Sequence, residues 1–335
     1  MTKITDDIYY YRHPLDANCV VFAYLTGYNR EFDLVDTGIG KFGIYRNVIK
    51  QMHKDGLDPR NVRNIFHTHV HFDHIQADHL FEKFASRRDH VPKVFIPEPD
   101  LYRFRPDYSV IDYNMRFLAN YFKGFPKKAF PTMPFIARYM LKPFFSATIP
   151  KDIEVFRDQQ ELLLGEYKMK AYITGGHTDG HAFFHIPEAG ILHAGDNDAL
   201  NEFIVDFSCV IESMMLANEL KPEMIFIGHN GPKETREDSQ NWIDRWFREF
   251  DVVLGVLKPF MRNGRTFNIT RIMKKMAGWA FKLEPVRFMA FMQLFVILRY
   301  LENKNYGTIE LNQSGTQLLF RTGEEVESKE LKLEP

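Results

Sequence analysis

Short apolar segments alternate with amphipathic ones along the first two hundred residues, without an internal repeat. A helix is expected over residues 41–54, where apolar residues recur at helical spacing until Asp55 and Gly56 end the pattern. Alternation of this kind favours an α/β fold built on a sheet. Short apolar runs predict strands at residues 8–11, 19–25, 32–35, 62–66, 93–96, 169–173, 182–186, 191–194 and 224–227.

A helix is expected at residues 208–220, before the last strand of the sheet domain, and from residue 235 the pattern becomes mostly helical. There, helices are expected at residues 238–260, 268–277 and 286–302, and strands at 308–311 and 316–320. The intervening segment from Asn312 to Gly315 is a good hairpin turn, and helices followed by two strands predict a winged-helix-like unit. The expected domains are a sheet domain over 1–234, a helical, winged-helix-like domain over 235–323 and a charged tail over 324–335.

Residues 97–150 form a separate stretch that is rich in proline, aromatic and basic residues and poor in acidic ones. Its segments predict short helices and turns, so we expect a helical insertion into the sheet domain. Such an insertion would serve as a lid that buries an apolar group and attracts an anion. The alternative, which the sequence supports equally, is a dimer interface or simple packing of the aromatic side chains.

The composition is that of an ordinary folded protein. The chain has 335 residues, 45% of them hydrophobic, and a net charge of −1, so no overall charge favours nucleic acid. Two cysteines and an N-terminus without an apolar signal segment predict a cytoplasmic protein. The most apolar run, residues 288–298, contains Gln293 and lies between Arg287 and Arg299, so we expect no membrane span but a buried helix or a homodimer contact.

The strongest chemical signal is the segment THVHFDH at residues 68–74, directly after the expected strand 62–66. An extended loop directs His69 and His71 to one side, while the adjacent Asp73 and His74 can turn toward a second point. This spacing suits two neighbouring metal ions better than one.

That segment resembles the histidine-rich motif of the metallo-β-lactamase superfamily. Further motifs of the family follow the expected strands in the family's order, namely VDTG at 35–38, GHTDGH at 176–181, AGD at 194–196 and GHNGP at 228–232. The resemblance implies a metallo-hydrolase with the αββα four-layer sandwich of that family. Asp179 and Asn230 depart from residues common in relatives, and Ile75–Ala77 replaces a Gly-rich step, but every ligand position is filled.

Carried over by position, the motifs imply a complete site for two ions. The first ion would be held by His69, His71 and His177, the second by Asp73, His74 and His229, and Asp196 would bridge them. Asp36 would orient ligating groups without binding metal itself. His67 and His181 stand beside ligands as candidate hydrogen-bond partners, whereas the remaining histidines, His193 among them, have no position in the motifs.

The implied chemistry is hydrolysis of an ester-type bond. Two divalent ions, zinc before iron or manganese, would share a hydroxide that attacks the substrate, and Asp73 would pass a proton to the leaving group. The ligand set lacks cysteine, which resembles thioesterases, lactonases and phosphodiesterases of the family more than its cysteine-containing antibiotic-hydrolysing members. The expected substrate is therefore a small lactone, carboxylester, thioester or phosphoester with an apolar portion.

Two other functions stay open at this point. Residues 258–323 are locally basic, and a superfamily core followed by such a unit also resembles endoribonuclease-like members, so nucleic acid is a second, less favoured partner. Persulfide dioxygenases share the motif set but use a single iron, so the metal content of each chain separates that redox alternative from hydrolysis.

Overall fold

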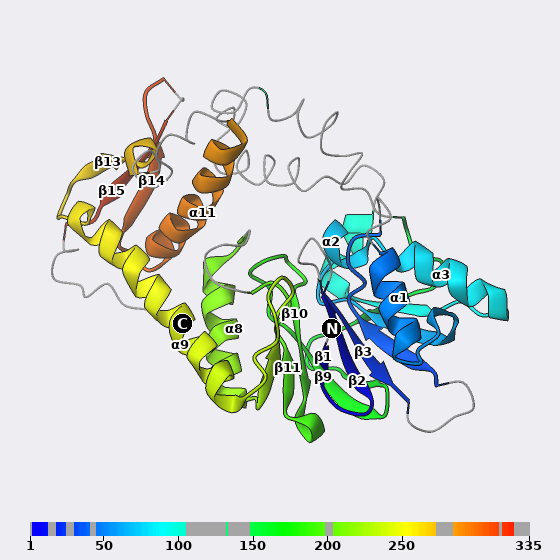
Figure 1. Cartoon of the computed structure of the whole chain (residues 1–335). Helices are drawn as coiled ribbons and strands as arrows, with labels where there is room; N and C mark the ends of the chain where they lie inside the picture. Colours follow the sequence, from blue (N-terminus) through cyan, green and yellow to red (C-terminus); the bar gives the residue numbers. More distant parts are fainter. Residues whose placement is uncertain are drawn as a thin grey trace. The chain divides into compact units, whose positions relative to one another are not determined.

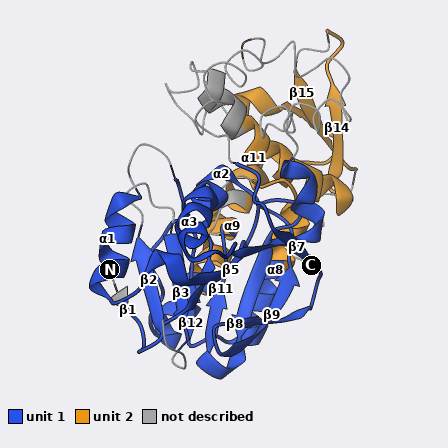
Figure 2. Cartoon of the chain, turned by 90° about the vertical axis from the view of Figure 1, so that its right-hand side faces the viewer, with its two compact units in different colours: residues 1–104, 145–198, 213–243 blue, residues 105–144, 199–212, 244–335 orange. Residues whose placement is uncertain are grey.

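Two compact units make up the chain in its computed structural model (Figures 1 and 2). Unit 1 comprises residues 1–104, 145–198 and 213–243, and unit 2 comprises residues 105–144, 199–212 and 244–335. The structure describes residues 2–12, 18–24, 30–40, 45–104, 132, 148–197, 204–272, 284–314 and 317–324, without the side chains of residues 2, 253 and 284–290. The predicted domain boundaries at 234/235 and 323/324 stay predictions.

The first sheet of unit 1 has seven strands, which lie in the order β1-β2-β3-β4-β5-β6-β7. Strands β1 to β4 pair antiparallel, whereas β4, β5, β6 and β7 pair parallel. The carboxyl ends of β4, β5 and β6 therefore meet at one edge. The strands are β1 Thr2–Lys3, β2 Ile8–Arg12, β3 Asn18–Ala23, β4 Phe32–Val35, β5 Val62–Phe66, β6 Lys93–Pro97 and β7 Ile153–Phe156.

The second sheet of unit 1 has five strands in the order β12-β11-β10-β9-β8. Its pairs are antiparallel except for β11 and β12, which run parallel. The strands are β8 Glu161–Leu164, β9 Tyr167–Ile173, β10 Ala182–Ile186, β11 Ile191–His193 and β12 Met224–Phe226.

Alternate residues of the strands divide between two cores. Ile8 and Tyr10 of β2 point into a core shared with Phe184 of the second sheet, which packs edge-on against Phe156. The intervening side chains of the first sheet face a second core with the helices α1 (Arg46–Lys54) and α3 (Asp78–Ala85). The two sheets thus enclose one core, and helices cover the outer face of the first sheet (Figure 1).

On the side of the second sheet, the helix α8 (Phe207–Leu220) contributes Ser213, whose hydroxyl accepts a hydrogen bond of 2.9 Å from Asn197 Nδ2 beyond the end of β11. The structure is therefore mixed α/β with two sheets between helices, as the predicted fold class requires. The predicted strands and helices are confirmed within a few residues where the structure describes them. The strands β1, β7 and β8 were not predicted: each lies at a sheet edge and has at most four residues, and β7 and β8 each expose two of their four residues.

Unit 2 contains a three-stranded antiparallel sheet in the order β13-β15-β14. Its elements include the end of α9 (Arg236–Leu257), β13 Thr266–Asn268, α11 Glu284–Asn303, β14 Gly307–Leu311 and β15 Leu318–Thr322. An aromatic cluster forms where Phe207 stacks on Trp246 and Phe250 and the ring of Tyr300 packs edge-on against Phe207 and Phe250. The predicted hairpin is confirmed, and β13 adds a strand that was not expected; the winged-helix assignment stays a prediction.

The apolar run at 288–298 lies in α11. From Phe291 to Leu298 its described side chains are buried apart from Gln293, which is half-buried, as expected of a helix packed within the protein. No helix among the described residues is long and apolar enough to cross a membrane. The proposed insertion at 97–150 falls outside the described residues over 105–131 and 133–147, so its role as a lid or dimer interface is untested.

Candidate metal centre

The loop that carries four of the predicted ligands begins where β5 ends. The backbone N–H of His67 still donates to Phe95 O of β6, at 2.9 Å, and the chain then leaves the sheet. His71 keeps an extended backbone and precedes the short helix α2 (Phe72–Ile75), whose first turn holds Asp73 and His74. Because the backbone changes from extended to helical, His69 and His71 point to one place and Asp73 and His74 to another, as the spacing predicted.

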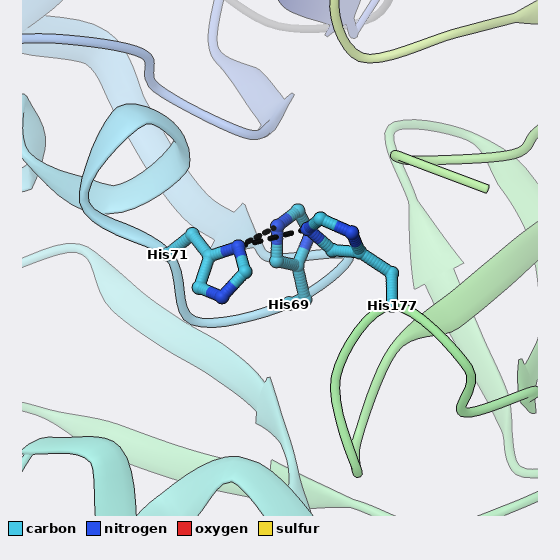
Figure 3. Close-up of side chains that lie close together, drawn as sticks. All are labelled: His69, His71 and His177. Carbon is cyan, nitrogen blue, oxygen red and sulfur yellow. Dashed lines mark hydrogen bonds between the residues drawn. The ribbon is translucent and has the colours of Figure 1, made fainter. Parts of the chain in front are cut away.

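Three imidazole rings converge in the first ligand group, which consists of His69, His71 and His177 (Figure 3). Nδ1 of His71 lies 3.1 Å from Nε2 of His69 and 2.8 Å from Nε2 of His177. All three side chains are buried. Burial, together with the neighbouring imidazoles, holds the pKa of His69 and of His71 well below the usual value, so these rings are neutral and can offer a lone pair.

Asp73, His74, Asp196 and His229 form the second ligand group. Oδ2 of Asp196 lies 3.1 Å from Nε2 of His74 and 2.9 Å from Nε2 of His229. The same Nε2 of His229 lies 3.3 Å from Oδ2 of Asp73. Burial opposes the charged form of both imidazoles, but Asp196 outweighs it, raising the pKa of His229 to about 11 and that of His74 well above its usual value. The raised pKa values keep both rings protonated beside the Asp196 carboxylate when no cation is bound.

The carboxylate of Asp196 faces both groups. Its Oδ2 also lies 3.7 Å from Nε2 of His69 and 3.6 Å from Nε2 of His177. Its Oδ1 is buried and has no hydrogen-bond partner among the described residues. Converging imidazole nitrogens and carboxylate oxygens suit a divalent transition metal, so the residues fit the ions that the sequence implied. No cysteine belongs to either group within the described part of the chain.

Asp36 lies behind the ligands, where β4 ends, in a left-handed backbone conformation with φ +54°. Its Oδ2 accepts a hydrogen bond of 2.8 Å from Nδ1 of His74, and its Oδ1 accepts one of 3.0 Å from the backbone N–H of Thr68. It belongs to neither ligand group. The contact with His74 fixes which ring nitrogen points toward Asp196, which is the orienting position expected of Asp36.

Two further histidines support the site. Nε2 of His181 accepts a hydrogen bond of 3.0 Å from the backbone N–H of Asp196. His67 lies between Asp36 and Asp78, 3.4 Å and 3.0 Å away; burial disfavours its charged form, but these two carboxylates raise the pKa of His67 to about 9. Both histidines are the hydrogen-bond partners that the sequence suggested.

Two buried aspartates near the ligand groups, Asp78 and Asp100, were not predicted from the sequence. Asp78 accepts a hydrogen bond from Thr37 Oγ1 and lies beside His67 Nε2, and Asp100 contacts the loops on both sides of the first ligand group. The signal for Asp100 was its position just after β6, because polar residues at the carboxyl ends of neighbouring parallel strands meet at one edge.

Comparison with known proteins agrees with this geometry. The sequence profile described as "Metallo-beta-lactamase superfamily" matches residues 15–229, which include every ligand of both groups. The chain belongs to the metallo-beta-lactamase superfamily. Members of this superfamily are generally metallo-hydrolases, and the chain is an enzyme of this kind. No curated protein matches the sequence.

Solved structures of the superfamily share the fold at low sequence identity. A metallo-beta-lactamase family protein of Thermus thermophilus is 19% identical, with a TM-score of 0.68 over 95% of this chain and 100% of that one. A beta-lactamase domain protein of Burkholderia ambifaria is 18% identical, with a TM-score of 0.71 over 96% and 93%. A double mutant of the sec-alkyl sulfatase PisA1 is 12% identical, with a TM-score of 0.59 over 89% and 50%.

Gly228 permits the close approach of the last histidine loop to Asp196. A Cβ atom there would overlap Oδ1 of Asp196 and lie 3.0 Å from Cε1 of His74. We expect Gly228→Ala to displace both side chains and to weaken binding of the second ion at least tenfold, measured by metal titration. Gly231→Ala is the matched control, because a Cβ at Gly231 meets no atom within 4 Å; equal affinities in the two variants would contradict this account.

Metal uptake by the second group should displace protons. Because the raised pKa values of His74 and His229 keep both rings protonated near neutral pH in the metal-free protein, an ion must compete with those protons. We expect affinity for the second ion to rise with pH between 6 and 8, by about tenfold per pH unit for each proton displaced. Calorimetry in buffers of different ionisation enthalpy measures the protons released; none released with the second ion would disprove the assignment.

Proposed function

We propose that the chain is a binuclear metal-dependent hydrolase of ester-type bonds. The observation that carries this proposal is the position of Asp196 Oδ2, which lies within 3.7 Å of ring nitrogens from both ligand groups. A carboxylate so placed can bridge two ions. His69, His71 and His177 would hold the first ion, and Asp73, His74 and His229 the second.

Each ion would supply Lewis acidity, which lowers the pKa of a water molecule and stabilises negative charge that develops on the scissile group. The protein residues supply geometry. The imidazoles of the first group are buried and held close together, so they need little rearrangement. Asp36 holds His74 by its other ring nitrogen, so that Nε2 of His74 stays directed at Asp196.

The substrate would approach along the side of Asp73 and His229. The side chains of these two ligands are 18% and 22% exposed, whereas those of His69, His74, His177 and Asp196 are at most 3% exposed. A carboxylate at the accessible side is placed to receive a proton and to deliver it to a leaving group, so we assign Asp73 this role.

The ester class follows from the donor set and from the family. Two imidazole- and carboxylate-bound ions suit attack at a carbonyl carbon or at phosphorus. The sec-alkyl sulfatase shares the fold alone, and it adds sulfate esters to the substrates worth testing. Zinc is our first choice of metal, before iron and manganese. A homodimer and a cytoplasmic location remain our expectations.

Removing one ligand from the first group or the bridging position tests the metal assignment. We expect His71→Ala and Asp196→Ala to lower kcat/KM more than about a hundredfold, because loss of a supporting contact alone costs a metal site 10- to 100-fold. Metal analysis should show less than the wild-type content in both. His185→Ala replaces a half-buried histidine of β10 outside both groups and should retain full content. Wild-type content in the Asp196 variant would exclude bridging.

One substrate panel tests the reaction class. Metal-reconstituted protein would be assayed with a lactone, an aryl ester, a thioester, a phosphodiester, an alkyl sulfate and a structured RNA. Turnover of a small ester above RNA is the expected result, and faster turnover of RNA would favour the endoribonuclease alternative. A single iron per chain with no second metal in the protein as isolated would instead favour the redox alternative.

A further inference from the structure

Asp100 is a buried carboxylate that belongs to neither ligand group. It lies in the 3₁₀ helix Glu98–Phe104, directly after β6, and is fully buried. None of the five motifs described above includes it. An ionised carboxylate in such a position is costly unless hydrogen-bond donors surround it, so its contacts indicate what it holds.

Four hydrogen bonds reach this carboxylate from two loops and one side chain. Oδ2 accepts from the backbone N–H of Val70 at 3.1 Å and from Oγ1 of Thr178 at 2.8 Å. Oδ1 accepts from the backbone N–H of Gly180 at 3.0 Å and from Nε of Arg103 at 2.8 Å. Val70 stands between His69 and His71, and Thr178 directly follows His177. The carboxylate therefore joins the two loops that supply the first ligand group.

The surroundings are built around this contact. The guanidinium of Arg103, whose side chain is 2% exposed, balances the buried negative charge. A Cβ atom at position 180 would lie 2.8 Å from Asp100 N and 2.9 Å from Asp100 Cγ, so the loop can approach Asp100 only because residue 180 is glycine. The close contact with Asp100 thus explains why the second glycine of the GHTDGH motif, Gly180, is required.

We propose that Asp100 is a positioning residue that locks the His69–His71 loop to the His177 loop, so that the three imidazoles converge before an ion binds. This inference rests on the proposed metal site. Its consequence is selective: the lock supports the first ion, whereas Asp36 holds His74 of the second group. Loss of Asp100 should weaken the first site and leave the second nearly unchanged.

Asparagine cannot replace Asp100 in either orientation. If its NH₂ group stands at the Oδ1 position, it faces the N–H of Gly180 and of Arg103; at the Oδ2 position it faces the N–H of Val70. One loop is released in each case. Asp33→Asn is a matched control, because Asp33 is equally buried and also accepts two backbone N–H groups, from Asn64 and Gly165, away from the ligand groups.

The first test needs no metal. Amide hydrogen exchange of the metal-free full chain should be at least tenfold faster in Asp100→Asn than in wild type at whichever of Val70 and Gly180 loses its acceptor, with no change at either amide in Asp33→Asn. Thr178→Val removes one donor and should weaken the lock without altering the carboxylate, whereas Thr178→Ser should restore wild-type exchange. The threonine pair also serves if Asp100→Asn fails to fold. Unchanged exchange at both amides would overturn the proposal.

The second test measures ion binding with Co²⁺ alone. In a His229→Ala background, which leaves the first group complete, Asp100→Asn should weaken Co²⁺ binding 10- to 100-fold. In a His177→Ala background, which leaves the second group complete, it should change binding less than about threefold. Faster amide exchange together with unchanged Co²⁺ affinity of the first group would overturn the positioning role proposed for Asp100. If wild type binds no Co²⁺, the metal function fails, while the exchange experiment still decides whether Asp100 joins the loops.

Discussion

The carboxylate of Asp196 lies against imidazole nitrogens of both ligand groups, and the surrounding loops are arranged to sustain that contact. Lone pairs brought this close in a buried place repel one another unless protons or cations lie between them. The protein meets this constraint with neutral rings on one side of Asp196 and protonated rings on the other. Hydrogen bonds support these positions: Asp36 accepts one from the ring of His74, Asp100 one from the backbone N–H of Val70, and His181 one from the backbone N–H of Asp196.

Each sheet contributes one half of the centre. Asp36, the loop from Thr68 to His74 and Asp100 follow the neighbouring parallel strands β4, β5 and β6. The second sheet supplies His177 between β9 and β10, Asp196 after β11 and His229 after β12. The apolar core between the sheets therefore fixes the distance between the two halves of the ligand set. Packing far from any ligand determines whether the nitrogens and oxygens converge.

The sequence was sufficient to name the residues that the structure brings together in the two candidate ligand groups, because four of them lie within six residues and the others occur in short motifs beside apolar strands. It was not sufficient for Asp100, whose partners Val70 and Gly180 are 30 and 80 positions away. The one signal that Asp100 carries, its position just after β6, does not indicate which loops it contacts. The edge strands β7 and β8 were missed for a related reason, since their pairing partners rather than their own composition define them.

The uneven exposure of the proposed ligands implies an order in which ions would enter and leave. Asp73 and His229 are partly exposed, whereas the three histidines of the first group are buried. With two ions bound as proposed, a chelator would reach the ion at Asp73 and His229 first and would leave the other ion on the histidines of the first group. Exchange at the more exposed group would then be the faster process, so a change in metal supply would alter its occupancy first.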